Sequence, residues 1–238
     1  MSDILTIYLG GDGTPWIQGR YIARDPTPRN PLALKLFIQD PAPAAYIARP
    51  CYYVDAYREV NASRDNKANI DDNSDSDKRD CDDARWWTDA RYSEPVLASM
   101  QSAMLNLQQA LGFKQIRLVG YSGGGAIAAL LTPRINASSL VTIAANLDID
   151  EWTHHHGYLT LKSSLNPQSM PPSSATNAAI HMAGAKDRAV PARIVGAFVK
   201  KHGGLLWVYK KYNHGCCWAR DWPSILKRID AATSLNGQ

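Results

Sequence analysis

Residues 119–126 read VGYSGGGA, and this stretch decides the fold. It holds a Gly-x-Ser-x-Gly pattern centred on Ser122, a match that chance alone supplies to roughly one in ten chains of this length. The residues on either side make the match specific, because residues 115–119, with Ile116, Leu118 and Val119, are typical of a strand and residues 126–131 are typical of a helix. We therefore expect Ser122 on the sharp turn between a strand and a helix, where a nucleophilic serine is held in a nucleophile elbow.

The glycines around Ser122 fit such a turn. Gly120 and Gly124 lie two residues to either side, where side chains would obstruct the turn. The N–H of Gly123, at the start of the expected helix, is a candidate donor to a developing oxyanion. A phosphate-binding glycine loop is the alternative, but neither GxxxxGK[ST] nor GxGxxG occurs in the chain.

Short apolar runs alternate with helix patterns along the chain. Strands are expected at residues 4–9, at 45–48 with 52–54 as a further piece, and at 115–119, 140–144, 179–183 and 205–209. Helices are expected at 30–38, 93–111, 126–131, 191–202 and 222–229. Asn30 is the expected N-cap of the first helix with Pro31 at its first position, Ser93 can cap the second helix, and Gly112 ends it. This alternation predicts an α/β fold, a mainly parallel sheet of about six strands with helices on both faces.

A serine hydroxyl needs a general base, and that base needs a carboxylate to orient it. Ligands of open α/β sheets bind beyond the carboxyl ends of the strands, so both groups are sought in the loops that follow strands. His214 follows the last strand and is the candidate base. Of the other histidines, His181 lies within an expected strand, His202 ends a helix, and those at 154–156 belong either to a cleft or to the surface.

Two carboxylates are candidates for the acid that orients His214. Asp187 follows the fifth strand by a short loop, and Asp148 holds the same place after the fourth strand. In both cases the chain order is serine, aspartate, histidine, which is the order found in α/β-hydrolases. Asp187 is the preferred acid, and Asp148 is the alternative. Whichever of the two is not the acid is expected to cap a loop.

The second oxyanion donor is expected in the loop after the first strand, GGDG at 10–13, with Gly11 or Asp12 as the donor. Residues 151–177, rich in Ser, Pro, Asn and His, are the candidate cap over the substrate pocket. Candidate pocket residues are aromatic: Trp16, Tyr121, Trp152 and Tyr158, with Leu161 beside them. The alternative is that the aromatic residues of the cap only pack it onto the body. No metal and no cofactor are implied, since no CxxC pair occurs and the histidines at 154–156 have no carboxylate at ligand spacing.

Composition fits a single domain over residues 1–238, with 45% hydrophobic residues and no apolar stretch that approaches a membrane span. The net charge of +4 is unevenly spread. Residues 61–83 contain eight Asp and four Lys or Arg, so they are expected to form an exposed acidic loop. No stripe of basic and aromatic residues is present, so nucleic acid is not an expected partner.

The four cysteines are Cys51, Cys81, Cys216 and Cys217, and they permit three pairings. A Cys51–Cys81 disulfide is preferred, because it would tie the acidic stretch to the body of the protein. Four reduced thiols in a cytosolic protein are the alternative. The adjacent Cys216 and Cys217 could bond to each other, stay reduced or pair elsewhere.

The chain resembles the α/β-hydrolase superfamily over nearly its whole length, without the initial antiparallel strand pair of that fold. More closely, the segments GGDGTPW, RPC, GYSGGG, LDIDEWT, SLNP and HGCCW look like those of bacterial hydrolases often described as exported proteins or lipoproteins. The resemblance implies Ser122, Asp187 and His214 as a catalytic triad and a Cys51–Cys81 disulfide. It favours a periplasmic or secreted protein, whereas a cytoplasmic one is expected if the N-terminus, which carries no signal segment, is native.

Together these residues predict a serine hydrolase, most simply a carboxylic-ester hydrolase, that needs no cofactor and acts on a small ester or acyl compound. Peptidase, thioesterase and acyltransferase activities use the same triad and stay open as alternatives. A hydrolase-fold module that binds a ligand without catalysis is the rival from another class. No oligomeric state follows from the pattern.

Overall fold

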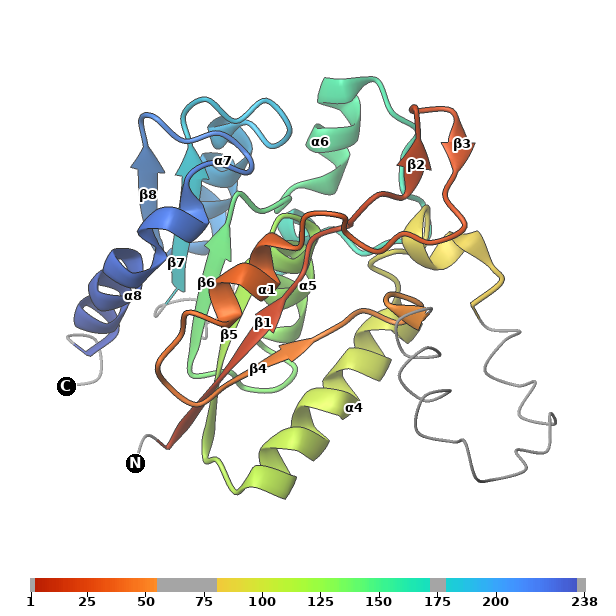
Figure 1. Cartoon of the computed structure of the whole chain (residues 1–238). Coiled ribbons are helices and arrows are strands. Elements are labelled where there is room, and N and C mark those ends of the chain that lie inside the picture. The colour runs from red at the N-terminus through yellow and green to blue at the C-terminus, as the bar shows by residue number, and fades with distance from the viewer. Residues whose placement is uncertain (1–2, 55–80, 172–178, 235–238) are drawn as a thin grey trace, which may run out of the picture.

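The computed structural model describes residues 3–54, 81–171 and 179–234 (Figure 1). At its centre is a six-stranded sheet in the order β4-β1-β5-β6-β7-β8. The strands are β1 (Ile4–Leu9), β4 (Ala44–Ile47), β5 (Gln115–Tyr121), β6 (Ser139–Ile143), β7 (Ala179–Gly184) and β8 (Leu205–Tyr209). Every pairing between neighbours in this sheet is parallel. All the carboxyl ends of the strands therefore lie at one edge.

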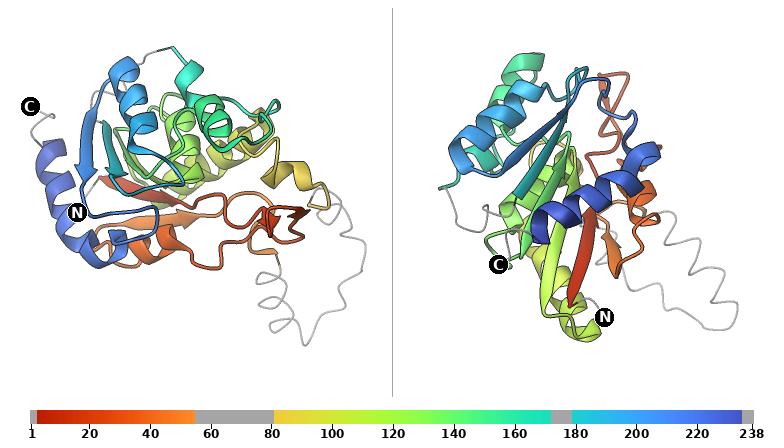
Figure 2. Two further views of the ribbon diagram at one scale, coloured as in Figure 1. Left: turned by 90° about the horizontal axis from the view of Figure 1, so that it is seen from above. Right: turned by 90° about the vertical axis from the view of Figure 1, so that its left-hand side faces the viewer.

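Helices cover both faces of the sheet (Figure 2). One face carries α4 (Glu94–Leu111), α5 (Gly123–Leu131) and α7 (Ala192–His202), and the other carries α1 (Leu32–Phe37) and α8 (Trp218–Ser234). Successive side chains of a strand point to opposite faces. On β1, Ile7 and Leu9 pack in the core under α4 and α5, whereas Tyr8 packs under α1 and α8. The predicted α/β fold class is confirmed: a parallel six-stranded sheet carries helices on both faces (Figure 2).

The structure adds elements that the sequence patterns did not indicate. A small antiparallel hairpin, β2 (Trp16–Ile17) and β3 (Tyr21–Ile22), projects from the loop after β1. The helix α6 (Ile149–His156) opens the segment that was expected to form a cap, and residues 172–178 of that segment lie outside the described part. Two 3-10 turns, η1 (Ala84–Trp87) and η2 (Pro167–Ser169), complete the described elements. The hairpin was not predicted because β2 and β3 have only two residues each, too few to show an alternating pattern of apolar and polar residues.

Several expected boundaries were wrong, among them the start of α5, which lies at Gly123 rather than at residue 126. The first helix begins at Leu32, because Pro31, with ψ 81°, is its N-cap; Asn30 instead accepts a hydrogen bond from Lys35. Residues 52–54 form no strand, since they follow a turn. The last helix begins at Trp218, four residues before the expected start, and continues through Pro223. Pro223 is the sixth residue of this helix, so it lies beyond the four N-terminal residues whose N–H groups have no helical partner and it removes one hydrogen bond inside the helix.

Two disulfides are formed. The preferred pair, Cys51 and Cys81, is bonded, with the Cα atoms 5.2 Å apart. Cys216 and Cys217 are bonded to each other. Most of the expected acidic loop at 61–83 lies outside the described residues. Within the described ranges, none of the helices combines the length and apolar character that a membrane span requires.

Candidate active site

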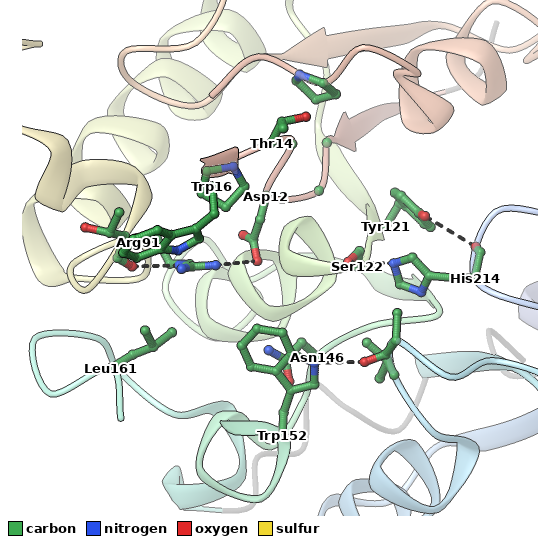
Figure 3. Close-up of a pocket in the computed structure, with 18 of the residues that line it drawn as sticks. Asp12, Thr14, Trp16, Arg91, Tyr121, Ser122, Asn146, Trp152, Leu161 and His214 are labelled. Atoms are coloured by element: carbon green, nitrogen blue, oxygen red, sulfur yellow. Dashed lines mark hydrogen bonds and ion pairs between the residues drawn. The ribbon is translucent and has the colours of Figure 1, made fainter. Parts of the chain in front are cut away.

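Loops from five strands meet where the strands of the sheet end (Figure 3). Asp12 follows β1, Ser122 follows β5, Asn146 follows β6, Asp187 follows β7 and His214 follows β8. A pocket of about 1220 Å³ opens here and is lined by Asp12, Ser122, Asn146 and His214, among others. Because every strand is parallel, these loops converge although the residues are far apart in the sequence.

Ser122 lies on the turn between β5 and α5, as expected. Its backbone angles are φ 53° and ψ −123°, a conformation that residues with a side chain rarely adopt. The turn is held by hydrogen bonds from the N–H of Ser122 to the carbonyl of Ile143 (2.9 Å) and from the N–H of Gly125 to the carbonyl of Ser122 (2.9 Å). A strained backbone of this kind persists only where its surroundings fix it.

The expected clearance at Gly120 and Gly124 is confirmed. A Cβ atom on Gly120 would overlap the carbonyl oxygen of Gly124. A Cβ atom on Gly124 would overlap the carbonyl oxygens of Leu9 and Gly10. Both contacts are with backbone, which cannot move aside without displacing β1 or α5. These two positions therefore need glycine.

His214 joins Ser122 to Asp187. Its Nε2 atom lies 3.1 Å from Oγ of Ser122, and its Nδ1 atom lies 2.8 Å from Oδ2 of Asp187. The Asp187 side chain is fully buried, and its other oxygen, Oδ1, accepts hydrogen bonds from the N–H groups of Ala189 (2.8 Å) and Val190 (2.9 Å). The carboxylate is thus fixed on both oxygens, and His214 is presented to Ser122 with a defined ring orientation.

Neighbouring aromatic groups hold the loop that carries His214. The indole N–H of Trp218 donates to the carbonyl of His214 (3.0 Å), and the hydroxyl of Tyr121 donates to the same carbonyl (3.3 Å). The rings of Tyr121 and His214 lie 5.1 Å apart. Tyr121 is the residue before Ser122, so the elbow and the histidine loop are packed directly together.

Asp148, the alternative acid, is the N-cap of α6. Its Oδ1 atom accepts hydrogen bonds from the N–H of Glu151 (3.2 Å) and from the side-chain amide of Asn166 (3.1 Å). The side-chain hydrogen bonds of His214 go to Ser122 and Asp187 instead. Asp148 therefore caps a helix, and the carboxylate hydrogen-bonded to His214 is Asp187.

The loop at 10–13 passes beside the elbow. A Cβ atom on Gly11 would lie 3.2 Å from Cβ of Ser122. The carboxylate of Asp12 turns away from the solvent and binds Arg49 and Arg91, whose guanidinium nitrogens lie 2.5 and 3.2 Å from it. The hydroxyl of Tyr92 also donates to it, at 2.6 Å. Both Gly11 and Asp12 line the pocket that holds Ser122.

The charge of Asp12 is stabilised by this cluster. Burial by itself raises the pKa of Asp12, but the guanidinium groups of Arg91 and Arg49 outweigh burial and lower the pKa to about 2. Burial and the adjacent Asp12 carboxylate raise the pKa of Tyr92 well above its usual value, so the phenol stays protonated. Sequence reasoning missed Arg49, Arg91 and Tyr92; the RPC segment, which begins at Arg49, was singled out for its resemblance alone, and no local signal marked the other two.

The four aromatic residues expected in the pocket all line it. Trp16 comes from the β2–β3 hairpin, and Trp152 and Tyr158 come from α6 and the loop behind it, so the pocket lies between these two structures (Figure 3). Trp152 is fixed by a hydrogen bond from its indole N–H to the carbonyl of Ala189 (2.8 Å). Trp16 is 42% exposed and Tyr158 is 57% exposed, so the mouth of the pocket is apolar and open to solvent.

Asn146 was not expected in the pocket. Its side chain is 2% exposed, and neither its amide nitrogen nor its oxygen has a hydrogen-bond partner among the described residues. Its backbone N–H donates to the carbonyl of Ser122 (3.3 Å), which ties the end of β6 to the elbow. The mostly apolar run 140–145 comes directly before Asn146, and nothing in that run indicates that the next residue lies in the pocket.

The remaining histidines do not line the pocket, although His156 stacks on the ring of Tyr158. His181 is fully buried on β7, its Nδ1 atom lies 2.9 Å from the hydroxyl of Thr142, and burial lowers its pKa to about 4. The histidines at 154–156 lie on α6 and are not among the pocket residues. In the ranges that the structure describes, no group of three or more His, Cys, Asp or Glu side chains is arranged to hold a metal ion.

No protein-family model matches the chain, and no curated protein sequence matches it. Similar solved structures include MGS-MChE2, an α/β hydrolase from the metagenome of lagoon sediments at Mar Chica, Morocco, with 16% identity and a TM-score of 0.47 over 60% of this chain and 71% of that one. The Pyrococcus furiosus esterase Pf2001 has 15% identity and a TM-score of 0.46 over 60% of this chain and 62% of the esterase. A monoacylglycerol lipase of Paleococcus ferrophilus has 10% identity and a TM-score of 0.41 over 57% of this chain and 76% of the lipase. The fold assignment rests on the strand order and pairings of this chain, and the activities named belong to those proteins.

Proposed function

We propose that the protein is a serine hydrolase that cleaves carboxylic esters, with Ser122 as nucleophile, His214 as general base and Asp187 as the acid that orients it. The observation that carries the proposal is the hydrogen-bonded chain from Oγ of Ser122 to His214 (3.1 Å) and on to Asp187 (2.8 Å). A serine beside a histidine that is itself oriented by a carboxylate is the arrangement that activates a hydroxyl for attack.

The proposed reaction begins with His214 neutral and its proton on Nδ1, donated to Asp187. Nε2 takes the proton of the Ser122 hydroxyl while Oγ forms a bond to the ester carbonyl carbon. The tetrahedral intermediate then breaks its bond to the alcohol, which leaves with the proton from Nε2. A water molecule repeats these steps on the acyl enzyme, releases the carboxylic acid and restores Ser122.

Two backbone N–H groups are proposed to bind the oxyanion. One is that of Gly123, which begins α5 and so has no carbonyl one turn earlier in the helix to bind. The other belongs to the 10–13 loop, from Gly11 or Asp12. The N-terminus of α5 adds the positive end of the helix dipole at the same point.

The walls of the pocket support an ester with an apolar acyl group. Trp16, Trp152 and Tyr158 supply aromatic surface, and the volume of about 1220 Å³ leaves room for a substrate larger than an acetyl ester. Amides and thioesters present the same carbonyl to Ser122. The competing peptidase, thioesterase and acyltransferase activities are therefore distinguished by turnover on matched ester, thioester and amide substrates of one acyl group.

Labelling with a fluorophosphonate probe tests the nucleophile, and a panel of p-nitrophenyl esters of increasing acyl length tests the reaction. We expect stoichiometric labelling of the folded protein at Ser122, turnover of at least one ester, and loss of both in Ser122→Ala. Equal turnover by Ser122→Ala and the wild type would rule out catalysis by this serine. A folded wild type that is neither labelled nor active on any substrate would favour a non-catalytic binding protein.

A further inference from the structure

A buried cluster of charged and phenolic groups lies directly behind the proposed oxyanion donors. At its centre is Asp12, with Arg49, Arg91 and Tyr92 around it. The side chains of Arg49 and Arg91 are 2% and 5% exposed, that of Asp12 is 15% exposed, and Tyr92 is fully buried. Burying charges is costly unless each is paired, so this cluster requires a specific reason to exist beside a pocket.

The cluster draws two distant segments, around Arg49 and around Arg91, onto Asp12. Oδ1 of Asp12 accepts a hydrogen bond from Arg49 (2.5 Å), and Oδ2 accepts hydrogen bonds from Tyr92 (2.6 Å) and Arg91 (3.2 Å). Arg49 also donates to the carbonyl of Arg91 (2.6 Å). The hydroxyl of Tyr52 donates to the backbone carbonyl of Asp12 (3.0 Å). Both the side chain and the backbone of Asp12 are therefore fixed.

The same carboxylate lies against the residue after the nucleophile. A Cβ atom on Gly123 would overlap Oδ1 of Asp12 and lie 2.7 Å from the hydroxyl of Tyr92. A backbone N–H can come from any residue but proline, so donation alone does not require glycine at position 123. Glycine is needed there because the Asp12 carboxylate occupies the space of a side chain. Asp12 thus contacts the residue that supplies one proposed oxyanion donor while its own loop supplies the other.

The charge of the cluster has the sign that favours an oxyanion. Two guanidinium groups, Arg49 and Arg91, face a single carboxylate, and the phenol of Tyr92 stays protonated. The cluster formed by these groups and Asp12 therefore carries one net positive charge. Fixed positive charge in a buried site stabilises negative charge that develops in the transition state, because no solvent has to reorganise around it.

We propose that Asp12 is a positioning residue for the oxyanion hole: held by Arg49, Arg91 and Tyr92, its carboxylate fixes the N–H groups of Gly123 and of the 10–13 loop in the orientation that the transition state needs. The inference rests on the proposed function. Asp12 acts through these backbone groups, so its loss should impair the stabilisation of a tetrahedral anion more than the binding of a neutral ester. That difference separates positioning from a purely structural contribution.

The test compares Asp12→Asn with Arg117→Gln as a matched control. Arg117 is also a largely buried arginine in an ion pair, 12% exposed and 2.7 Å from Asp230, but it lies on β5 toward the opposite edge of the sheet. We expect Asp12→Asn to lower kcat for a p-nitrophenyl ester about 10²-fold or more, the scale of losing one oxyanion donor, with KM changed less than about threefold. Affinity for an alkylboronic acid, which forms a tetrahedral anion on a serine, should fall with kcat. Arg117→Gln should lower thermal stability with little change in kcat.

Tyr92→Phe and Arg49→Lys keep the test decisive if Asp12→Asn does not fold. Tyr92→Phe removes one hydrogen bond to the carboxylate, and Arg49→Lys keeps its positive charge; both should fold, with a kcat between those of the wild type and Asp12→Asn. The inference is overturned if the folded variants keep kcat within about threefold of the wild type, or if only KM rises. An active wild type with unaffected variants overturns this inference alone. A wild type that is neither active nor labelled at Ser122 overturns both it and the proposed function.

Discussion

Asp187→Asn changes a single atom of the proposed triad and should remove most of the activity. Oδ1 of Asp187 accepts the N–H groups of Ala189 (2.8 Å) and Val190 (2.9 Å), and Oδ2 accepts from Nδ1 of His214 (2.8 Å). In the variant, the amide oxygen keeps the two backbone donors, which turns the NH₂ group toward Nδ1 of His214. Two donors would then face each other unless His214 moves its proton to Nε2.

A proton on Nε2 prevents His214 from acting as the base. Nε2 lies 3.1 Å from Oγ of Ser122, so a proton there would point at the hydroxyl that has to be deprotonated. In serine proteases the same change of tautomer lowers kcat about 10⁴-fold, or about 5 kcal/mol of activation free energy. Since the exchange preserves shape and the two backbone hydrogen bonds, the variant should fold with a similar Tm.

The assay is the kcat of purified variants on a p-nitrophenyl ester that the wild type hydrolyses, with Asp148→Asn as the matched control. Asp148 caps α6 and asparagine is as good an N-cap as aspartate, so this variant should lose little stability and keep kcat within about threefold. The reasoning fails if Asp187→Asn retains more than a tenth of the wild-type kcat. It also fails if Asp148→Asn is the variant that loses activity.

Two further outcomes follow from buried positions. Burial lowers the pKa of His181 from 6.5 to about 4, so on acidification the unfolded chain binds a proton at this histidine before the folded protein does. The free energy of unfolding should therefore fall by about 3 kcal/mol as the pH drops from 6.5 to about 4. Urea titrations at several pH values measure how the free energy of unfolding changes with pH. The same pH dependence in His181→Gln would contradict the prediction. Gly124→Ala places a Cβ atom against two backbone carbonyls at the end of β1, so it should lower Tm and fluorophosphonate labelling together. Normal labelling at an unchanged Tm would show that the contact is not rigid.

Much of the architecture was readable from local patterns. A run such as 140–144 is mostly apolar because both faces of its strand are buried, and this needs no knowledge of its neighbours. The elbow at Ser122 was readable for a similar reason, since a sharp strand-to-helix turn requires glycine on both sides. The errors fell where local chemistry permits several outcomes. Pro31 fits both the N-cap and the first helical position, and Pro223 favours a helix start at Trp222 although the helix begins four residues earlier.

Which of the two carboxylates lies beside His214 was decided by the tertiary structure. Asp187 and Asp148 each follow a strand by a short loop, so both could reach a histidine after the last strand, and the sequence supported only a preference for Asp187. The difference arises because α6 begins at Ile149 and takes Asp148 as its N-cap, whereas the loop after β7 directs Asp187 toward His214. Which of two similar loops faces a third depends on strand order and packing.

The sequence by itself determined the alternating strands and helices, the strained turn at Ser122 and the candidate partners in their order along the chain, because backbone conformation and burial leave periodic, local traces. Only the tertiary structure decided that Arg49, Arg91 and Tyr92 would meet on the carboxylate of Asp12, since these groups lie 37 to 80 residues away from it in the chain. No local pattern records a contact over such a separation. It exists because parallel strands place the loops at their carboxyl ends side by side.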